Sequence, residues 1–314
     1  MADRQFRFGI ICPKAGSGKE LTELARKAED LGYSTLYVPD HFVEDHDLAP
    51  PVALAHVAAV TERLRIGPLV LGNDYKHPVV LARELATLDV LSDGRLDVGI
   101  GAGWMRADYE KAGMQLDRPG VRIARLAESI TILKGLFGDG PFSFKGEHYQ
   151  VTELDGEPKP VQRPCPPFLI GGGAPKILAL AAREAQIVGI NANLRSGDGH
   201  SKDAAHSLVP EATDQKLTWL RDAAGDRFDD LEIQCLVGFV HITDDASSIA
   251  EAVAKGFGVS TDEALLSPAT LVGSHDGMCE MLERRRERWQ MSFTVVPHDV
   301  VESFAPVVAR LNGK

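Results

Sequence analysis

Short apolar runs alternate with amphipathic stretches along the first third of the chain. The runs at 6–12, 34–38, 66–71 and 96–100 have the pattern of strands that are buried on both faces. Between them, apolar residues recur three or four positions apart, as they do on one face of a helix. Strands that are joined by single helices lie parallel in one sheet, so this alternation predicts repeated βαβ units.

The rest of the chain continues the alternation, with three departures. Further strands are expected at 167–170, 187–190, 231–242 and 292–296, and further helices at 121–137, 213–224, 276–290 and 300–311. The departures are a small hairpin over 142–151, a long polar loop over 191–206 and extra helix over 246–268. Eight strands alternating with helices predict a (β/α)8 TIM barrel, with a doubly wound open sheet as the alternative. Because no linker or change of composition interrupts it, we expect 1–314 to form a single barrel domain.

The stretch from Arg65 to Trp104 breaks the rules for regular strands. Pro68 lies inside an expected central strand, where a proline removes a hydrogen bond of the ladder. Gly99, Gly101 and Gly103 alternate through the end of the next strand, which indicates a close approach of the backbone to some other group. Both irregularities lie near strand ends, where α/β proteins bind their ligands.

Residues with functional chemistry gather after the expected strands. They are Asp40 and His41 after the second strand, Gly72, Asn73 and Asp74 after the third, Gly101, Ala102, Gly103 and Trp104 after the fourth, the Gly171 turn after the fifth, Asn191 after the sixth and His298 after the eighth. Each alone is explained by an ordinary turn. In a barrel all of these positions meet at one face, so together they predict a site there.

Two glycine-rich segments suggest phosphate binding, and only one has a suitable context. Residues 99–103 lack the Gly-x-Gly-x-x-Gly spacing of a dinucleotide-binding turn, because Trp104 stands where a third glycine would follow. The turn Gly171-Gly172-Gly173-Ala174-Pro175-Lys176 instead leads into a helix, and the free N–H groups of a helix start bind anions. A cofactor phosphate is the expected ligand.

Composition excludes several classes of function. With 34 basic and 45 acidic residues, the net charge of -11 argues against a nucleic-acid partner. Four widely spaced cysteines, no signal peptide and no long apolar run favour a cytoplasmic protein without a membrane segment. His41, Asp45 and His46 have the chemistry of metal ligands, but no third convergent group accompanies them, and no metal is expected. Hydrolase and NTPase motifs are absent from the sequence.

Four segments resemble the bacterial luciferase-like flavin enzymes, and among them the group of probable coenzyme F420-dependent oxidoreductases. They are 32–42 (GYSTLYVPDHF), 65–104, 167–175 (PFLIGGGAP) and 304–311 (FAPVVARL). The resemblance covers nearly the whole chain. It implies a (β/α)8 barrel with a flavin or deazaflavin ring at the strand ends, a small-molecule substrate and a possible homodimer.

The resemblance also implies roles for individual residues. A bulge in the third strand would carry a non-proline cis peptide at Leu69–Val70, with Gly67–Pro68 as the other candidate for a cis bond. Asp40 and His41 would be the catalytic pair, with Asp40 holding His41. Gly172, Gly173, Ala174 and Pro175 would bind the cofactor phosphate. The other expected cofactor contacts are Leu69, Val70, Gly72, Asn73, Gly101, Ala102, Gly103, Trp104, Gly171 and Lys176.

The expected activity is hydride transfer between the C5 atom of coenzyme F420 and a small organic substrate. A dehydrogenase of the family has a proton-donating glutamate where this chain has Trp104, which disfavours a sugar-phosphate substrate. The alternatives are an FMN-dependent monooxygenase and a non-catalytic flavin-binding relative. Lys176 is expected near the cofactor phosphate, and Lys76 and Arg195 near the glutamate tail that F420 carries.

Overall fold

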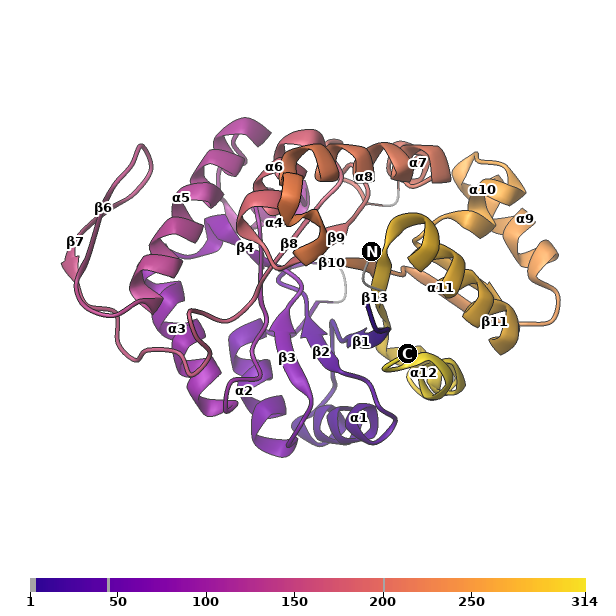
Figure 1. Cartoon of the computed structure of the whole chain (residues 1–314), viewed down its shortest axis with the longest axis horizontal. Coiled ribbons are helices and arrows are strands. Elements are labelled where there is room, and N and C mark those ends of the chain that lie inside the picture. The colour runs from indigo at the N-terminus through magenta and orange to yellow at the C-terminus, as the bar shows by residue number, and fades with distance from the viewer. Residues whose placement is uncertain (1–3, 44–45, 200) are drawn as a thin grey trace.

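A computed structural model describes residues 4–43, 46–199 and 201–314. Its main sheet has nine strands in the order β3-β2-β1-β13-β10-β9-β8-β5-β4, and every neighbouring pair is parallel (Figure 1). The two strands at the ends of this order, β3 (Arg65–Pro68) and β4 (Leu71–Gly72), are halves of one interrupted strand. A bridge between Ile66 and Leu96 joins β3 to the segment before β5, so the sheet closes on itself. The expected (β/α)8 barrel is confirmed, and the open sheet is wrong.

The other barrel strands match the apolar runs. They are β1 (Arg7–Ile11), β2 (Thr35–Val38), β5 (Val98–Gly101), β8 (Phe168–Gly172), β9 (Ile187–Ile190), β10 (Glu232–Leu236) and β13 (Met291–Pro297). They read as almost continuous apolar runs because one face packs inside the barrel and the other against helices.

Helices surround the barrel (Figure 1). They are α1 (Gly18–Asp30), α2 (Pro50–Val60), α3 (Pro78–Leu91), α4 (Arg106–Ala112), α5 (Pro119–Phe137), α6 (Pro175–Glu184), α7 (Lys202–His206), α8 (Pro210–Ala224), α9 (Ala246–Phe257), α10 (Thr261–Leu266), α11 (His275–Trp289) and α12 (Ala305–Leu311). Short 3-10 turns add η1 (Asn73–Tyr75), η2 (Gly225–Asp230) and η3 (His298–Val300). No helix in the described ranges is long and apolar enough to cross a bilayer.

Two segments depart from the barrel, and one of them corrects the sequence prediction. The expected hairpin is present as β6 (Phe142–Lys145) and β7 (Gln150–Leu154), which pair antiparallel and project from one side in Figure 1. The expected single strand at 231–242 is wrong. After β10 ends, β11 (Phe239–Ile242) pairs with β12 (Thr270–Gly273) in a separate two-stranded sheet. The backbone N–H of Gly238 donates to the carbonyl of Ala269, so the chain changes partner at this point.

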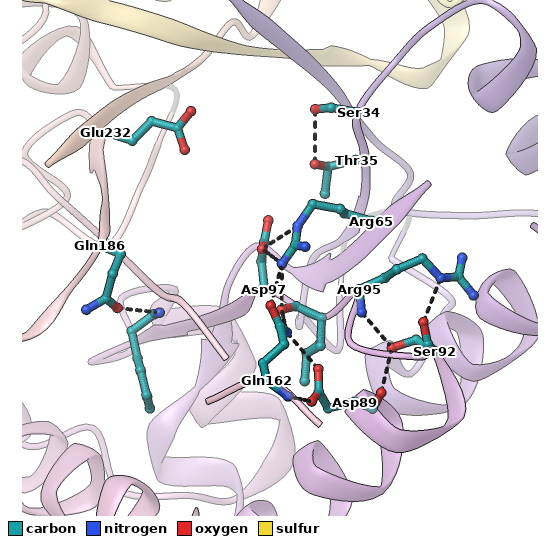
Figure 2. Close-up of polar contacts among 12 residues, drawn as sticks. Ser34, Thr35, Arg65, Asp89, Ser92, Arg95, Asp97, Gln162, Gln186 and Glu232 are labelled. Atoms are coloured by element: carbon teal, nitrogen blue, oxygen red, sulfur yellow. Dashed lines mark hydrogen bonds and ion pairs between the residues drawn. The ribbon is translucent and has the colours of Figure 1, made fainter. Parts of the chain in front are cut away.

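Side chains fill the barrel interior in layers. The middle of the interior holds one apolar group, Tyr37, Leu69, Leu169, Ile187, Phe293 and Val295, with the half-buried Ile11, Val70 and Leu236 packed against it. At the amino ends of the strands lies a polar layer centred on Asp97, whose carboxylate is fully buried. Arg65 points directly at Asp97 in Figure 2, and Gln162 beside it bonds to Asp89. Because the interior is packed, a ligand site must lie at a rim.

Candidate functional site

The carboxyl ends of the strands form a rim that we call the mouth, made by residues 39–43, 72–77, 101–109, 172–176 and 191–199. The third strand is irregular here, as predicted: β3 ends at Pro68, β4 begins at Leu71, and the Leu69–Val70 peptide is cis. The predicted cis bond at Leu69–Val70 is therefore confirmed, and Gly67–Pro68 is not among the cis bonds of the described residues.

The glycines of β5 make room for this irregular segment. A Cβ atom on Gly99 would lie 1.9 Å from the carbonyl oxygen of Pro68, and one on Gly101 would lie 2.7 Å from Cγ2 of Val70. The close approach indicated by the alternating glycines is thus an approach of the chain to itself. Gly99 and Gly101 determine where Val70 lies, and through it the inner wall of the mouth.

Asp40 and His41 follow β2 and lie at the mouth, but they do not form a pair. Oδ2 of Asp40 accepts a hydrogen bond of 3.0 Å from the backbone N–H of Gly72, which ties the loop after β2 to the end of β4. Burial raises the pKa of Asp40. His41 is instead held by Asp108, whose Oδ2 lies 2.6 Å from Nδ1 of the imidazole. The expectation that Asp40 holds His41 is wrong, because the Asp40 carboxylate is directed at Gly72.

Asp108 is a buried carboxylate with three hydrogen-bond donors. Besides His41, it accepts from the backbone N–H of Phe42 at 2.8 Å and from the hydroxyl of Tyr75 at 3.1 Å. Burial and the nearby charge of Asp108 raise the pKa of Tyr75, which keeps its hydroxyl a donor. Because Nδ1–H of His41 donates to Asp108, Nε2 is the ring nitrogen left to exchange a proton with a ligand.

A second carboxylate fixes the short helix α4 that carries Asp108. The hydroxyl of Tyr109 donates to Oδ2 of Asp74 at 3.0 Å, and Arg125 bonds to Oδ1 of Asp74 at 2.8 Å and also to Asp117. Gly103 has a φ of +75°, and a Cβ there would lie 1.9 Å from the Tyr109 hydroxyl. Glycine at 103 is therefore required for two reasons: the backbone has a positive φ there, and a side chain would clash with the Tyr109 hydroxyl.

Trp104 forms an apolar wall beside His41. Their ring centroids are 5.4 Å apart and nearly perpendicular, and His46 packs on His41 at 4.8 Å. The 191–206 loop, which contains α7, lies over the indole: a Cβ on Gly199 would be 3.3 Å from Cη2 of Trp104. This loop thus covers one side of the mouth.

The residues at the mouth fit a flat ring with one polar edge. Ile11, Val70 and Leu236 are half-buried apolar side chains at the top of the interior. Asn73 is almost fully buried, and its Nδ2 has no hydrogen-bond partner among the described residues. A buried donor without a partner is rare and points to a missing acceptor. An apolar floor with an unpaired amide beside it is suited to a flavin or deazaflavin ring.

The Gly171–Lys176 turn fits a phosphate. β8 ends at Gly172 and α6 begins at Pro175, and the N-cap residue Ala174 provides no side-chain hydrogen bond to the first turn. A Cβ on Gly173 would lie 2.3 Å from the carbonyl oxygen of Ala192, so this turn packs directly against the loop after β9. Lys176 is exposed at the first turn. An uncapped helix start with a nearby ammonium group favours an anion.

The remaining sequence predictions fall at the mouth or are not described. The carbonyl oxygens of Ala102 and Gly103 accept from Arg122, and His298 lies in η3 after the last barrel strand. Asp45, a candidate metal ligand together with His41 and His46, lies outside the described residues. Within the described ranges no three His, Cys, Asp or Glu side chains converge in a way that could hold a metal ion.

Two hollows lie away from the mouth. One of about 350 Å³ lies at the amino ends of the strands and is lined by Arg7, Arg65, Asp97 and Glu232, which bond to one another. The other, of about 450 Å³, lies against α10, α11 and β12. The charged groups of the first hollow satisfy each other, which is typical of the stabilising end of a barrel.

Sequence reasoning missed Asp108, although it predicted the face on which Asp108 lies. The residue follows the glycine-rich end of the fourth strand, and an acid there belongs to the same rim as Asp40 and His41. That position was the available signal. Its pairing with His41 spans 67 residues and depends on how α4 is seated, which no local pattern reveals.

This fold is a barrel of parallel strands, with the polar and glycine-rich segments of the chain gathered at the carboxyl ends of those strands. The chain belongs to the luciferase-like monooxygenase family, whose model matches residues 6–309. It is similar to an F420-dependent glucose-6-phosphate dehydrogenase of Amycolatopsis mediterranei, with 33% identity over 171 residues, which are 52% of this chain and 51% of that protein.

Two further proteins to which the chain is similar are named for different cofactors. The oxygenase component of a flavin-dependent trigonelline monooxygenase of Acinetobacter baylyi is 31% identical over 160 residues, 50% of this chain and 43% of that protein. The chain thus matches about half the length of these curated relatives. The structure of a coenzyme F420-dependent tetrahydromethanopterin reductase from Methanopyrus kandleri superposes with a TM-score of 0.77 at 19% identity, covering 98% of this chain and 99% of that chain, which supports the fold.

Proposed function

We propose that this protein is a coenzyme F420-dependent oxidoreductase that transfers a hydride between the deazaflavin C5 and a small organic substrate. The observation that carries the proposal is the His41–Asp108 pair at the mouth, at the same rim as the half-buried apolar side chains and the unpaired amide of Asn73. The bound deazaflavin would supply a two-electron hydride donor or acceptor. The protein would supply the proton that such a reaction also needs.

The proton step is assigned to Nε2 of His41. Nδ1–H donates to the buried carboxylate of Asp108, which fixes the tautomer and the plane of the ring. Tyr75 and the Phe42 N–H hold that carboxylate from the other side. Trp104 and the loop over it limit the access of water to this part of the mouth. A histidine so held can give or take a proton, and therefore suits a reversible oxidoreductase.

Leu69, Val70 and Asn73 are proposed to contact the ring, and the residues from Gly171 to Lys176 the phosphate. The experiment that tests the proposal is a fluorescence titration of the purified protein with F420 and, separately, with FMN. We expect F420 to bind more tightly. Tighter binding of FMN, together with oxygen consumption when the flavin is reduced, would instead establish the FMN-dependent monooxygenase, which the similarity to the trigonelline enzyme favours.

The charged tail of F420 gives a sharper prediction. Lys176 is exposed at the start of α6, where no carboxylate pairs with it among the described residues. Lys76 is already 2.6 Å from Glu84, and so contributes less net charge. We expect Lys176→Ala to weaken F420 binding about three- to tenfold at low salt and to leave FMN binding less affected.

The matched control is Lys202→Ala, an exposed lysine at the start of the five-residue helix α7, away from the phosphate turn. Raising the salt concentration should weaken F420 binding to the wild type more than to Lys176→Ala, because screening acts on the lost contact. Equal salt dependence in the two proteins would show that Lys176 does not contact the tail.

A further inference from the structure

On two neighbouring barrel strands, a glycine leaves the space that a side chain would fill. In each case the amide side chain of a residue in or directly after the next strand takes that space. A Cβ on Gly171 of β8 would lie 2.6 Å from Nδ2 of Asn191, and one on Gly189 of β9 would lie 2.8 Å from Oε1 of Gln234. The register places these glycines side by side, since Gly171 pairs with Gly189 and Gly189 pairs with Gln234. The chain thus omits two side chains and places two amides in their space.

Gln234 points into the barrel. It pairs with Phe293, which belongs to the inner apolar group, and paired residues of parallel strands share a face. The residue is fully buried, yet neither its Oε1 nor its Nε2 has a hydrogen-bond partner among the described residues. Buried polar side chains in folded proteins are paired almost without exception, so an amide with both ends unpaired indicates that a partner is missing.

Asn191 lies one step closer to the mouth and is held firmly by its backbone. Its N–H donates to the carbonyl of Gly172 at 3.0 Å, and its carbonyl accepts from Nζ of Lys216 at 2.7 Å. The side chain is half-buried, and Nδ2 lies 3.6 Å from the same Gly189 Cβ position that Oε1 of Gln234 approaches. The two amides therefore flank one point below the rim, across the barrel from the strand that leads to His41.

The chemistry around this point selects a neutral ligand group. An amide presents one acceptor oxygen and a donor nitrogen, and neither amide carries a charge. The nearby cations of the rim are paired: Arg106 with Glu110, and Arg125 with Asp74 and Asp117. The exposed Lys176 is assigned to the cofactor phosphate at the Gly171–Lys176 turn, and a carbonyl or hydroxyl oxygen at the two uncharged amides would find both donors and acceptors.

We propose that Asn191 and Gln234 form a substrate-recognition element of this barrel, and that they bind a neutral carbonyl or hydroxyl oxygen of the substrate other than the oxygen that exchanges a proton with His41. Asn191 contacts the oxygen from the rim, and Gln234, whose amide has no partner among the described residues, contacts it from below. This inference rests on the proposed function for the identity of the reaction, and on the two amides alone for the class of substrate.

The test uses cyclohexanone as the probe and methylenecyclohexane as its control, because the second replaces the carbonyl oxygen with a CH₂ group of similar shape. The ¹⁵N-labelled side-chain amides are observed by NMR, and those of Gln234 and Asn191 are assigned by their loss in Gln234→Leu and Asn191→Ala. We expect both amide signals to shift with cyclohexanone and not with the control. Each substitution should weaken cyclohexanone binding about tenfold while F420 binding stays unchanged.

Gln186→Leu is the matched control variant, since Gln186 lies at the opposite end of the barrel, where its Oε1 accepts from the N–H of Phe168. It should leave ketone binding unchanged. Equal shifts with both probes, or unchanged ketone affinity in Gln234→Leu, would overturn the proposal and leave the amide paired with buried water. If Gln234→Leu does not fold, Asn191→Ala, altered only at the half-buried rim, decides the same question.

Recording the titration with and without F420 separates this inference from the proposed function. Amide shifts with the ketone in a protein that binds neither F420 nor FMN would uphold the amide pair and reject the cofactor. Tight F420 binding without amide shifts would support the proposed cofactor and reject the amide pair as a substrate-binding element.

Discussion

Asp108→Asn is expected to lower kcat for hydride transfer between reduced F420 and a carbonyl substrate by about 10²- to 10⁴-fold. The carboxylate accepts Nδ1–H of His41 at 2.6 Å, and an asparagine can present an N–H to Nδ1 instead, which moves the imidazole proton to Nε2. To reduce a carbonyl, His41 must give a proton from Nε2 of its imidazolium form, and an N–H directed at Nδ1 removes the carboxylate that stabilises this charged form. KM should change little, because the Asp108 side chain is fully buried behind His41 and is not exposed to a ligand.

Two measurements separate this role from a purely structural one. The ¹⁵N shifts of the His41 ring report the tautomer directly, and they should change in Asp108→Asn without loss of the fold. Tyr75→Phe removes one donor to the same carboxylate and leaves the histidine contact intact, so its kcat should fall only a few-fold. An Asp108→Asn enzyme with wild-type kcat would remove His41 from the proposed proton step.

Asp97→Ala is expected to lower the free energy of unfolding by about 3–5 kcal/mol, the largest stability effect that we predict. The buried carboxylate of Asp97 accepts from Arg65 at 2.6 Å and 2.9 Å, from Arg7 at 3.2 Å and from the Tyr37 hydroxyl at 3.1 Å. Removing it leaves two guanidinium groups and a hydroxyl without their shared acceptor beneath the inner apolar group. Urea unfolding followed by circular dichroism measures the effect.

The control for this prediction is Glu280→Gln on α11, where Glu280 and Arg284 form an exposed pair at 3.4 Å. Surface pairs of this kind contribute little, so the change in unfolding free energy should stay within about 0.5 kcal/mol. Similar losses in the two variants would mean that the polar layer at the amino ends does not support the barrel. The F420 affinity of folded Asp97→Ala should remain close to that of the wild type, since the layer lies at the end opposite the mouth.

Periodicity predicted the alternation of strands and helices, because a strand buried on both faces and a helix with one apolar stripe leave different patterns in the sequence. It favoured the barrel and left the open sheet as an alternative, since the closing contact between the first and last strands of the sheet order is long-range. Pro68 and the alternating glycines after Gly99 indicated where the third strand would be irregular. The apolar run at 231–242 led to the wrong prediction of one strand. Its apolar residues continue across the point where β10 ends and β11, which pairs with β12 outside the barrel sheet, begins. A change of partner strand is a long-range event that leaves no mark in the local pattern.

The site was predicted at the level of the rim and not at the level of its contacts. Asp40 and His41 are adjacent in sequence, which favoured a pair, but their side chains leave the backbone toward different loops. The partners that they have, Gly72 and Asp108, lie 32 and 67 residues away. Such contacts depend on the closure of the barrel and on the position at which α4 packs against it. Both are determined by packing across the whole chain.

The contact between the bulge and β5 has an evolutionary consequence. Because Gly99 and Gly101 leave room for Pro68 and Val70, a side chain at either glycine would require a compensating change across the strand pair. In related barrels these four positions should therefore change together, so that a bulge is lost where the glycines are lost. The interrupted strand β3–β4 and its neighbour β5 should therefore evolve together. To engineer a new floor for this mouth, both strands would have to be exchanged at once.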